Sequence, residues 1–296
     1  MHAPHRPGAG ELGEFLRSRR ARLAPEDVGV VSYGARRVPG LRREELAQLA
    51  GVSITYYTRL EQGQSGNASD AVIEALARAL RLTDDERAHL HDLARPRPGR
   101  RRRPARPDTA SQGVRQLIAA MTEVPALVLG RRTEVLAWNS LAHRLLAGHL
   151  DPDAPDRPVD RPNLTRMLFL DPHTRDLHVR WEEEAARAVA ALRLVAGRHA
   201  DDRELAELIG ELSMKSPAFA ALWSRHPVQT CVSGTKRLRH PVVGEFDLDF
   251  EMLHLPGDAG HRLMTYPAAV GSPAEAALRL LQADLGAETL AVRQRA

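Results

Sequence analysis

The sequence predicts two folded domains, an all-α domain followed by an α+β domain. Up to residue 94 the apolar residues recur at the spacing of amphipathic helices. Residues 246–252 instead alternate strictly between apolar and acidic, which is the period of a half-buried strand. Between the two lies an arginine- and proline-rich run that cannot form a helix. The predicted organisation is a helical domain over residues 11–94, a linker over residues 95–110 and a second domain over residues 111–285.

Charge is distributed unevenly along the chain. Residues 1–107 contain 20 Arg and no Lys against 13 acidic residues, a net charge of +7. Residues 108–296 contain 22 basic against 25 acidic residues, a net charge of −3. The general preference for Arg over Lys in this chain does not explain that asymmetry. Because a basic domain neutralises phosphates and releases counterions, the asymmetry favours double-stranded DNA as the partner of the first domain.

Several classes of protein are disfavoured by what the sequence lacks. A single cysteine, Cys231, excludes an intramolecular disulfide and a cysteine-rich zinc site, and it fits a reducing compartment. There is no apolar signal-peptide core, and no run reaches the roughly 18 apolar residues of a membrane span. No phosphate-binding glycine loop, nucleophile elbow or zinc-protease motif is present. We therefore expect a cytoplasmic, nucleoid-associated protein that is not an enzyme, has no membrane partner and needs no metal or cofactor.

The first predicted helix spans residues 11–23, and a long connection over residues 24–41 follows it. Four arginines lie immediately before or at the start of the next helix: Arg36, Arg37, Arg42 and Arg43. We expect them to contact DNA phosphates, because the helix that follows would direct its N-terminus at the backbone. A solvated loop is the alternative interpretation.

Residues 46–63 have the pattern of two short helices joined by a tight turn. Leu46, Leu49 and Ala50 form one apolar stripe in the first helix. Gly51 can adopt the left-handed conformation that ends a helix, and Ser53 is placed to cap the next one. This arrangement is typical of a helix-turn-helix, whose second helix enters the DNA major groove. An ordinary helical hairpin is the alternative.

The second helix of this motif should present one face to DNA. We expect Tyr57 and Leu60 to face inward and Glu61 to have a structural role. Arg59 is the best candidate for a bidentate contact to guanine. The residues predicted to lie at the DNA surface of this helix are Ser53, Thr55, Tyr56 and Arg59.

Two more helices should close the first domain. The fourth follows a cap at Ser69 or Asn67, and the fifth spans residues 84–94 after a cap at Thr83. Acidic residues in the first turn of the fifth helix suit the helix macrodipole. Residues 95–107 should be an extended linker, with non-specific DNA affinity as a secondary role.

The second domain combines helices with antiparallel strands. Two short strands should flank a turn at residues 130–133, and residues 246–252 should pair with strands at residues 229–233, 236–240 and 262–266. The expected result is one antiparallel sheet with helices on one side. The predicted helices are residues 112–121, one from Asn139 to Leu146, one from Asn163 stopped by Asp171 and Pro172, residues 181–199, one starting at Asp201, one opening at Ser216 and Pro217, and residues 273–285.

Two family resemblances accompany these patterns. Residues 46–63 resemble the lambda-repressor-like (Xre) helix-turn-helix family, in which Leu-Ala, Gly-Val-Ser and Leu/Ile-Glu-x-Gly occur in this order. The chain also resembles the MmyB-like regulator family at residues 36–45, 135–139, 163–172, 216–219, 222–226 and 240–244. Together the resemblances span residues 11–285. They imply a five-helix DNA-binding domain and an α+β, PAS-like domain that binds a fatty-acid-like or other hydrophobic small molecule, in a transcriptional regulator.

Aromatic residues on the predicted inward faces are candidates for that ligand site, although core packing is the alternative for each of them. A ligand carboxylate could pair with one of three basic residues. We expect Glu182, Glu183 and Glu184 to form a solvated helix face. The ligand-site candidates are Trp138, Phe169, Phe219, Trp223, Phe250 and Tyr266, with Arg180, Lys236 and His240 as the basic residues.

Two hypotheses for function remain open. In the first, a bound apolar ligand changes the disposition of two DNA-binding heads in a homodimer, by as much as its affinity differs between the two states. In the second, the C-terminal domain holds no small molecule and serves dimerisation or binding of a protein partner. A homodimer is expected in either case because two half-sites one helical turn apart strengthen DNA binding.

Overall fold

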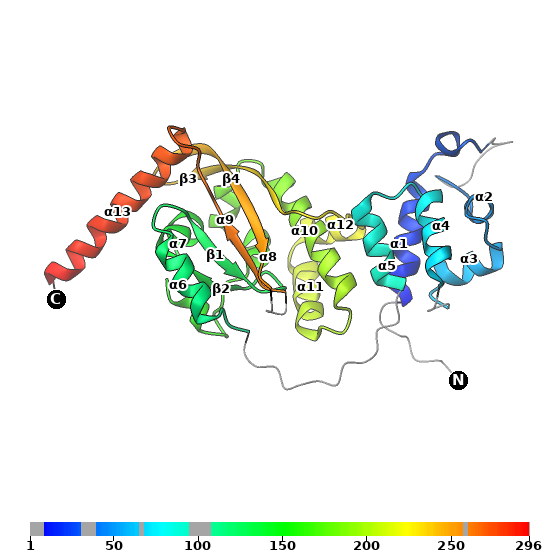
Figure 1. Cartoon of the computed structure of the whole chain (residues 1–296), viewed down its shortest axis with the longest axis horizontal. Helices are drawn as coiled ribbons and strands as arrows, with labels where there is room; N and C mark the ends of the chain where they lie inside the picture. Colours follow the sequence, from blue (N-terminus) through cyan, green and yellow to red (C-terminus); the bar gives the residue numbers. More distant parts are fainter. Residues whose placement is uncertain (1–8, 31–39, 65–67, 95–107, 257–259, 296) are drawn as a thin grey trace. The chain divides into compact units, whose positions relative to one another are not determined.

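The described residues up to Ala94 form five helices, as the sequence predicts. The computed structural model describes residues 9–30, 40–64, 68–94, 108–256 and 260–295 (Figure 1). A 3₁₀ turn, η1 (Pro25–Val28), lies in the long connection, where no helix was predicted. Pro25 suits the first turn of a helix, and Gly29 ends η1 at a φ of 72°. The five helices are α1 (Ala9–Arg22), α2 (Arg43–Leu49), α3 (Ile54–Glu61), α4 (Asp70–Ala79) and α5 (Asp84–Ala94).

These helices surround one apolar core. The prediction that Leu49 faces inward is wrong, since Leu49 is 40% exposed. Ala47 and Ala50 occupy that side of α2 together with Leu46. Ser69, one of the two predicted caps, caps α4 with its hydroxyl 3.4 Å from the Val72 nitrogen, and Asn67 lies outside the described residues. The core side chains include Leu12, Phe15, Leu16, Leu41, Leu46, Tyr57, Leu60, Ile73, Leu76 and Leu90.

The chain divides into two compact units, and three helices contribute residues to both of them. Unit 1 consists of Met1–Arg101, Val189–Glu207 and Ala221–Thr230, and unit 2 of Arg102–Ala188, Leu208–Ala220 and Cys231–Ala296. The shared helices are α10 (Trp181–Arg198), α11 (Arg203–Lys215) and α12 (Pro217–Ser224).

Unit 2 contains a five-stranded antiparallel sheet in the order β2-β1-β5-β4-β3. One strand, β3, replaces the two segments predicted at residues 229–233 and 236–240. The alternation predicted for β4 is confirmed, with Phe246, Leu248 and Phe250 buried and the intervening acidic residues exposed. The strands are β1 (Ala126–Leu129), β2 (Val135–Trp138), β3 (Ser233–His240), β4 (Gly244–His254) and β5 (Arg262–Thr265).

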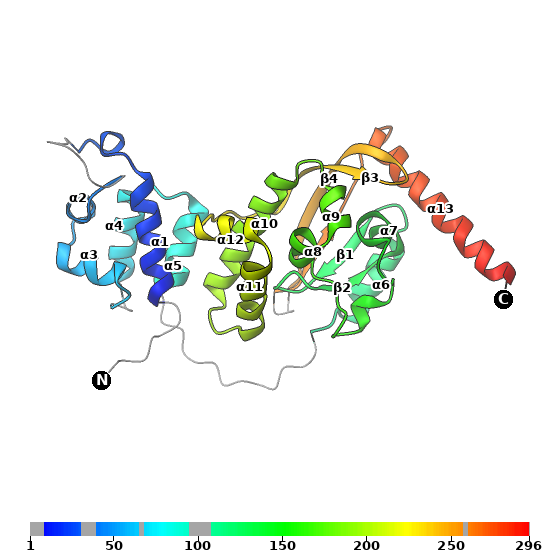
Figure 2. The same ribbon diagram turned by 180° about the vertical axis from the view of Figure 1, so that it is seen from behind.

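Helices pack on both faces of the sheet at β1, so the prediction of helices on one side is wrong there, whereas the acidic face of β4 is exposed. All four residues of β1 are buried. Leu127 and Leu129 pack with α7 (Ser140–Ala147) and α13 (Pro273–Arg295) in one cluster. Ala126 and Val128 pack with Ile118 of α6 (Gln112–Ala120) in another. A strand with apolar side chains on both faces of the sheet must be covered by other elements on both faces. Both views show the later part of α13 extending beyond the sheet (Figures 1 and 2).

Asn139 joins three of these elements and caps α7 as predicted. Its Oδ1 accepts hydrogen bonds from the nitrogens of Ala142, at 2.8 Å, and Ala126, at 3.1 Å. Its Nδ2 donates to the carbonyls of Met121 and Val124, both at 2.8 Å. The amide therefore satisfies backbone groups at the end of α6, the start of β1 and the start of α7.

A further helix begins where the sequence suggested only a stop. α8 (Leu164–Leu170) ends before Asp171, as predicted, but α9 (Pro172–Leu177) follows at once. Asp171 caps α9 with its carboxylate 3.3 Å from the Thr174 nitrogen and 2.6 Å from its hydroxyl. Pro172 occupies the first helical position, where its missing N–H costs nothing.

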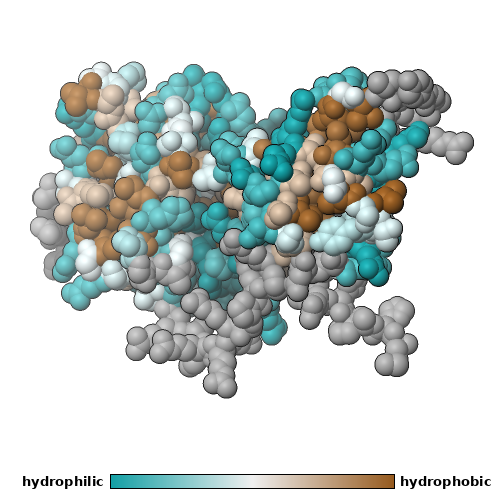
Figure 3. Space-filling model, turned by 45° about the vertical axis from the view of Figure 1, so that its right-hand side comes forward, coloured by the Kyte–Doolittle hydropathy of each residue, from teal (hydrophilic) through white to brown (hydrophobic). Residues whose placement is uncertain are grey.

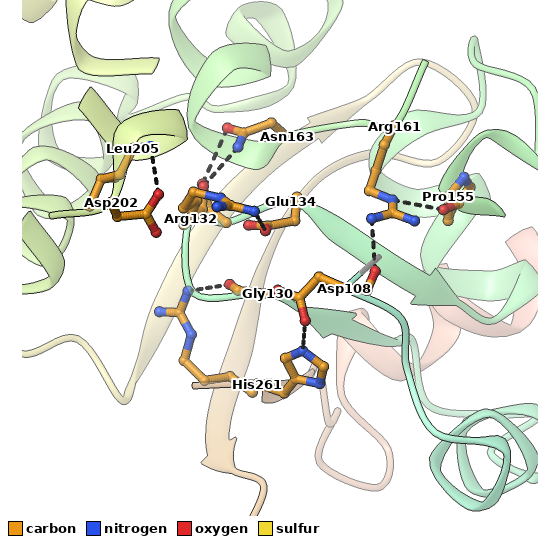
Figure 4. Close-up of polar contacts among 12 residues, drawn as sticks. Asp108, Gly130, Arg132, Glu134, Pro155, Arg161, Asn163, Asp202, Leu205 and His261 are labelled. Atoms are coloured by element: carbon orange, nitrogen blue, oxygen red, sulfur yellow. Dashed lines mark hydrogen bonds and ion pairs between the residues drawn. The ribbon is translucent and has the colours of Figure 1, made fainter. Parts of the chain in front are cut away.

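Polar contacts organise the turn between β1 and β2 (Figure 4). Arg132 pairs with the buried Glu134 at 3.0 Å. The Asn163 amide donates to the Arg132 carbonyl at 2.7 Å. Beside this turn, Asp108 lies 2.5 Å from His261, and its carbonyl accepts a hydrogen bond from Arg161 at 2.8 Å. These contacts hold the turn and the first described residue after the linker.

On the face shown in Figure 3, apolar residues reach the surface in several separate patches. Within the described ranges, no helix has the length and hydropathy needed to cross a membrane.

One histidine is enclosed in the interior of unit 1. His89 of α5 is 3% exposed, and its ring meets that of Phe15 edge to face at 5.1 Å. Its Nδ1 has no hydrogen-bond partner among the described residues. Burial, followed by the positive charges of Arg193 and Arg19, lowers the pKa of His89 to about 3.

We expect His89 to make unit 1 sensitive to acid. The unfolded imidazole takes up a proton near pH 6.5, whereas the folded one does so only near pH 3. The contribution of the neutral imidazole to the free energy of unfolding is therefore fully present above pH 6.5. It is lost as the pH falls, and the free energy of unfolding decreases by about 2 kcal/mol between pH 7 and pH 5. Urea unfolding at both pH values should show a smaller decrease for His89→Gln than for the wild type. Equal decreases would contradict this assignment.

Candidate nucleic-acid interface and ligand site

The turn between α2 and α3 has the local geometry that the sequence predicts. Gly51 adopts a φ of 66°, which ends α2 in the left-handed region. The Ser53 hydroxyl accepts a hydrogen bond from the Tyr56 nitrogen at 3.2 Å and caps α3. Tyr57 and Leu60 are fully buried on the inner face of α3.

The opposite face of α3 is open to solvent. Thr55 and Arg59 are exposed and lie one helical turn apart, so their side chains share that face. Ser53 is also exposed, and Tyr56 is half-buried. Ile54, 48% exposed, adds an apolar surface that could contact a thymine methyl group. These side chains have the chemistry needed at a base edge.

A buried carboxylate fixes α3 in place. Glu61 accepts hydrogen bonds from Arg20 at 2.7 Å, from the Tyr57 hydroxyl at 2.6 Å and from Arg43 at 2.7 Å. Burial alone would raise the pKa of Glu61, but these hydrogen bonds outweigh it and hold the pKa below its ordinary value. Arg20 also donates to the Leu41 carbonyl at 2.6 Å. The structural role predicted for Glu61 thus joins α1, α2 and α3.

The predicted phosphate-contacting arginines have different surroundings. Arg43 donates to Glu61 yet keeps 45% of its side chain exposed. The Arg42 backbone nitrogen donates to Glu45 at 2.6 Å, and its guanidinium lies 3.6 Å from Glu44. Arg36 and Arg37 lie outside the described residues. Both described arginines are at the N-terminus of α2, where backbone N–H groups also favour an anion.

Three of the predicted ligand-site residues lie together in unit 2. The rings of Phe250 and Tyr266 are 6.5 Å apart. The Lys236 ammonium lies 4.7 Å from the centre of the Phe250 ring. Lys236 also forms a buried ion pair with Glu184 of α10. This corrects the prediction that Glu184 lies on a solvated face; its spacing of three residues from Trp181 was the signal that it faces inward.

Several further polar groups lie around this ion pair. Burial raises the pKa of the Tyr266 phenol and of the Cys231 thiol. Burial, and then the nearby Lys236, lowers the pKa of His178 to about 4. The Nδ1 atom of His178 has no hydrogen-bond partner among the described residues. We call Glu184, Lys236, Phe250 and Tyr266 the Lys236 cluster.

Two other candidates belong to a separate aromatic group in unit 2. The ring of Phe169 meets those of Phe219, at 5.1 Å, and Trp181, at 5.7 Å, both edge to face. Trp181 donates its indole N–H to the Leu168 carbonyl at 2.8 Å. Because Trp181 opens α10 and Glu184 follows one turn later, this group continues along α10 into the Lys236 cluster.

The remaining candidates do not join these groups. Trp138 donates its indole N–H to the Pro152 carbonyl at 2.7 Å. His240 contacts the Arg144 carbonyl at 3.1 Å and accepts from the Val242 nitrogen at 3.2 Å, so both ring nitrogens are engaged. Arg180 is exposed. Trp223 belongs to unit 1, where its ring stacks on the Arg193 guanidinium at 3.8 Å.

Comparison with known families matches both parts of the chain. Residues 11–90 match a helix-turn-helix domain. Residues 110–281, more than half of the chain, match the MmyB-like transcription regulator ligand binding domain. No curated protein matches the chain. The chain thus combines a DNA-binding domain with a domain that binds a small molecule in transcription regulators.

We expect Glu61→Gln to destabilise the helix-turn-helix. Glutamine removes the negative charge that compensates Arg20 and Arg43, and disruption of a buried ion pair costs about 3 kcal/mol or more. The free energy of unfolding in urea at pH 7 measures this loss. Glu44→Gln is the matched control, because Glu44 is exposed and an exposed pair contributes about 1 kcal/mol or less. Similar losses for both variants would contradict the role of Glu61.

Proposed function

This chain belongs to the family defined by the MmyB-like transcription regulator ligand binding domain, and on that premise we propose that it is a sequence-specific regulator controlled by a small anionic amphiphile. The first domain binds double-stranded DNA through α3, with Arg59 contacting a base and Arg42 and Arg43 contacting phosphates. Two copies of the chain bind two half-sites. Because the target is DNA, we place its site of action on the nucleoid.

The charge balance of the Lys236 cluster is the observation that supports an anionic ligand. The Glu184 carboxylate forms ion pairs with both Lys236 and Arg187, and the side chains of Glu184 and Lys236 are only 8% and 11% exposed. Glu183 also approaches Arg187, but at 3.9 Å and with 56% of its side chain exposed. Lys236 is thus enclosed with one carboxylate, Glu184, which also pairs with the partly exposed Arg187. Because Lys236 shares its carboxylate with a second cation, a ligand anion would find a buried ammonium to pair with.

The apolar part of the proposed ligand follows from what surrounds this charge. Phe250 and Tyr266 are buried beside Lys236, and Cys231, Met252 and Met264 pack in the same core cluster. A ligand with one carboxylate and a hydrocarbon portion would match both the charge and these apolar side chains. A fatty acid is the simplest such molecule.

Arg59→Ala should weaken specific DNA binding far more than non-specific binding. A bidentate contact to guanine contributes about 1–3 kcal/mol to discrimination, roughly 5- to 150-fold in affinity. The test compares a duplex selected by the wild type from random sequences with a scrambled duplex, at one salt concentration. Arg78→Ala, on the exposed face of α4, is the control. Equal losses on both duplexes would show that Arg59 contacts phosphate instead.

Lys236→Met should reduce the amount of acidic amphiphile carried through purification. Methionine keeps most of the side-chain volume but removes the charge that pairs with the carboxylate. The purified protein is denatured, extracted with organic solvent and examined by mass spectrometry, with an expected loss of about tenfold for a charge-assisted contact. Lys215→Met is the matched control, since Lys215 is exposed and is the other lysine in the chain.

An empty extract from the wild type would favour the second hypothesis. The C-terminal domain would then serve dimerisation or binding of a protein partner. An equal loss of amphiphile in both lysine variants would remove Lys236 from the site.

A further inference from the structure

Within unit 1, the C-terminal part of α10 and the segment after α12 pack against the helix-turn-helix. Arg198 of α10 pairs with Asp92 of α5 at 3.1 Å. Thr230 donates its backbone N–H to the Asp85 carboxylate at 2.7 Å. Val228 packs against the apolar core of the helix-turn-helix. Residues distant in the sequence thus contact one face of this domain, formed by α1 and α5, which we call the α1–α5 face.

One contact on this face requires a glycine, which has no side chain. Gly197 lies against the His89 ring, and a Cβ atom at position 197 would be 2.5 Å from Cε1 and 2.6 Å from Nδ1 of that ring. His89 cannot turn into solvent, because it is 3% exposed and meets the ring of Phe15. Glycine is a poor residue for a helix interior, so its presence near the end of α10 matches the need for a close approach.

Two buried arginines lie close to the same contact. Arg19 of α1 donates to the His226 carbonyl at 2.6 Å and pairs with Glu86 at 2.9 Å. Arg193 of α10 stacks on Trp223 and donates to its carbonyl. They are 3% and 6% exposed. Burial of guanidinium groups is costly, and this cost opposes the gain from apolar packing at the contact.

The α1–α5 face is connected to the recognition helix by a short covalent and hydrogen-bonded path. Arg19, which contacts the docked segment, is followed directly in α1 by Arg20. Arg20 donates to Glu61 at the end of α3. A Cβ atom on Gly13 of α1 would lie 2.1 Å from the Glu61 carbonyl oxygen, so α1 and the end of α3 are in direct contact. We therefore expect a displacement of α1 to displace α3 as well.

We propose that the α1–α5 face is a docking surface for residues 189–198 and 221–230 of the same chain, and that this contact restrains the recognition helix. The docked segment contacts this face where Gly197 packs against the His89 ring. The restraint reaches α3 through α1 and Glu61.

The test uses a bulky residue at position 197 and measures amide hydrogen exchange of the full-length protein. Gly197→Leu improves the helix propensity of α10 but places an isobutyl group in the space of the His89 ring. Amides of α1, α5 and α3 should exchange about tenfold faster, as expected for an overpacked contact that opens. Gly210→Leu is the matched control in α11, because no atom lies within 4 Å of its added Cβ.

A second substitution separates undocking from general damage. His89→Ala removes the imidazole, so in the double variant, which combines it with Gly197→Leu, the isobutyl group can occupy the vacated volume and restore slow exchange. Equal exchange in the Gly197→Leu and Gly210→Leu variants would overturn the docking surface. Faster exchange that His89→Ala does not reverse would overturn the Gly197–His89 contact. Loss of protection in α1 and α5 with α3 unchanged would overturn the restraint on the recognition helix.

Discussion

The buried carboxylate of Glu61 is the interaction on which the DNA-binding half of the structure depends. A negative charge enclosed at the junction of three helices is tolerable only with several donors, and here Arg20, Arg43 and the Tyr57 hydroxyl supply them. Arg20 lies in α1, Arg43 in α2 and Tyr57 in α3, the recognition helix. The electrostatic requirement of one side chain therefore determines the positions of α1 and α2 relative to α3. The exposed face of α3 can vary without disturbing this arrangement, because its side chains take no part in it.

Local features of the fold were predictable because their causes lie within a few residues. Gly51 and Ser53 define the turn by their own backbone preferences and capping chemistry, and Asn139 caps α7 in the same way. The strict alternation in β4 likewise identified its buried face. A helix on the second face of the sheet was not predicted from the sequence, although β1 is apolar at four consecutive positions. A run of four residues does not distinguish a strand covered on both faces from other buried segments.

Partners distant in the sequence were not predictable, and the proposed ligand site depends on them. Lys236 was a candidate because of its charge, but its pairing with Glu184 joins positions 52 residues apart. Of the aromatic candidates, only Phe250 and Tyr266 lie beside it, since an inward-facing ring can face any of several helices. The pairing of Gly197 with His89 also has no local signal. Glycine near the C-terminus of a helix is usually explained by the left-handed conformation that ends the helix.

The use of arginine at every basic position of the first 107 residues has a consequence for regulation by covalent modification. Acetylation neutralises lysine, and no lysine is present in this part of the chain. Lysine acetylation therefore cannot change the charge of the surface proposed to contact phosphates, and this common way of weakening DNA binding is not open to the first domain.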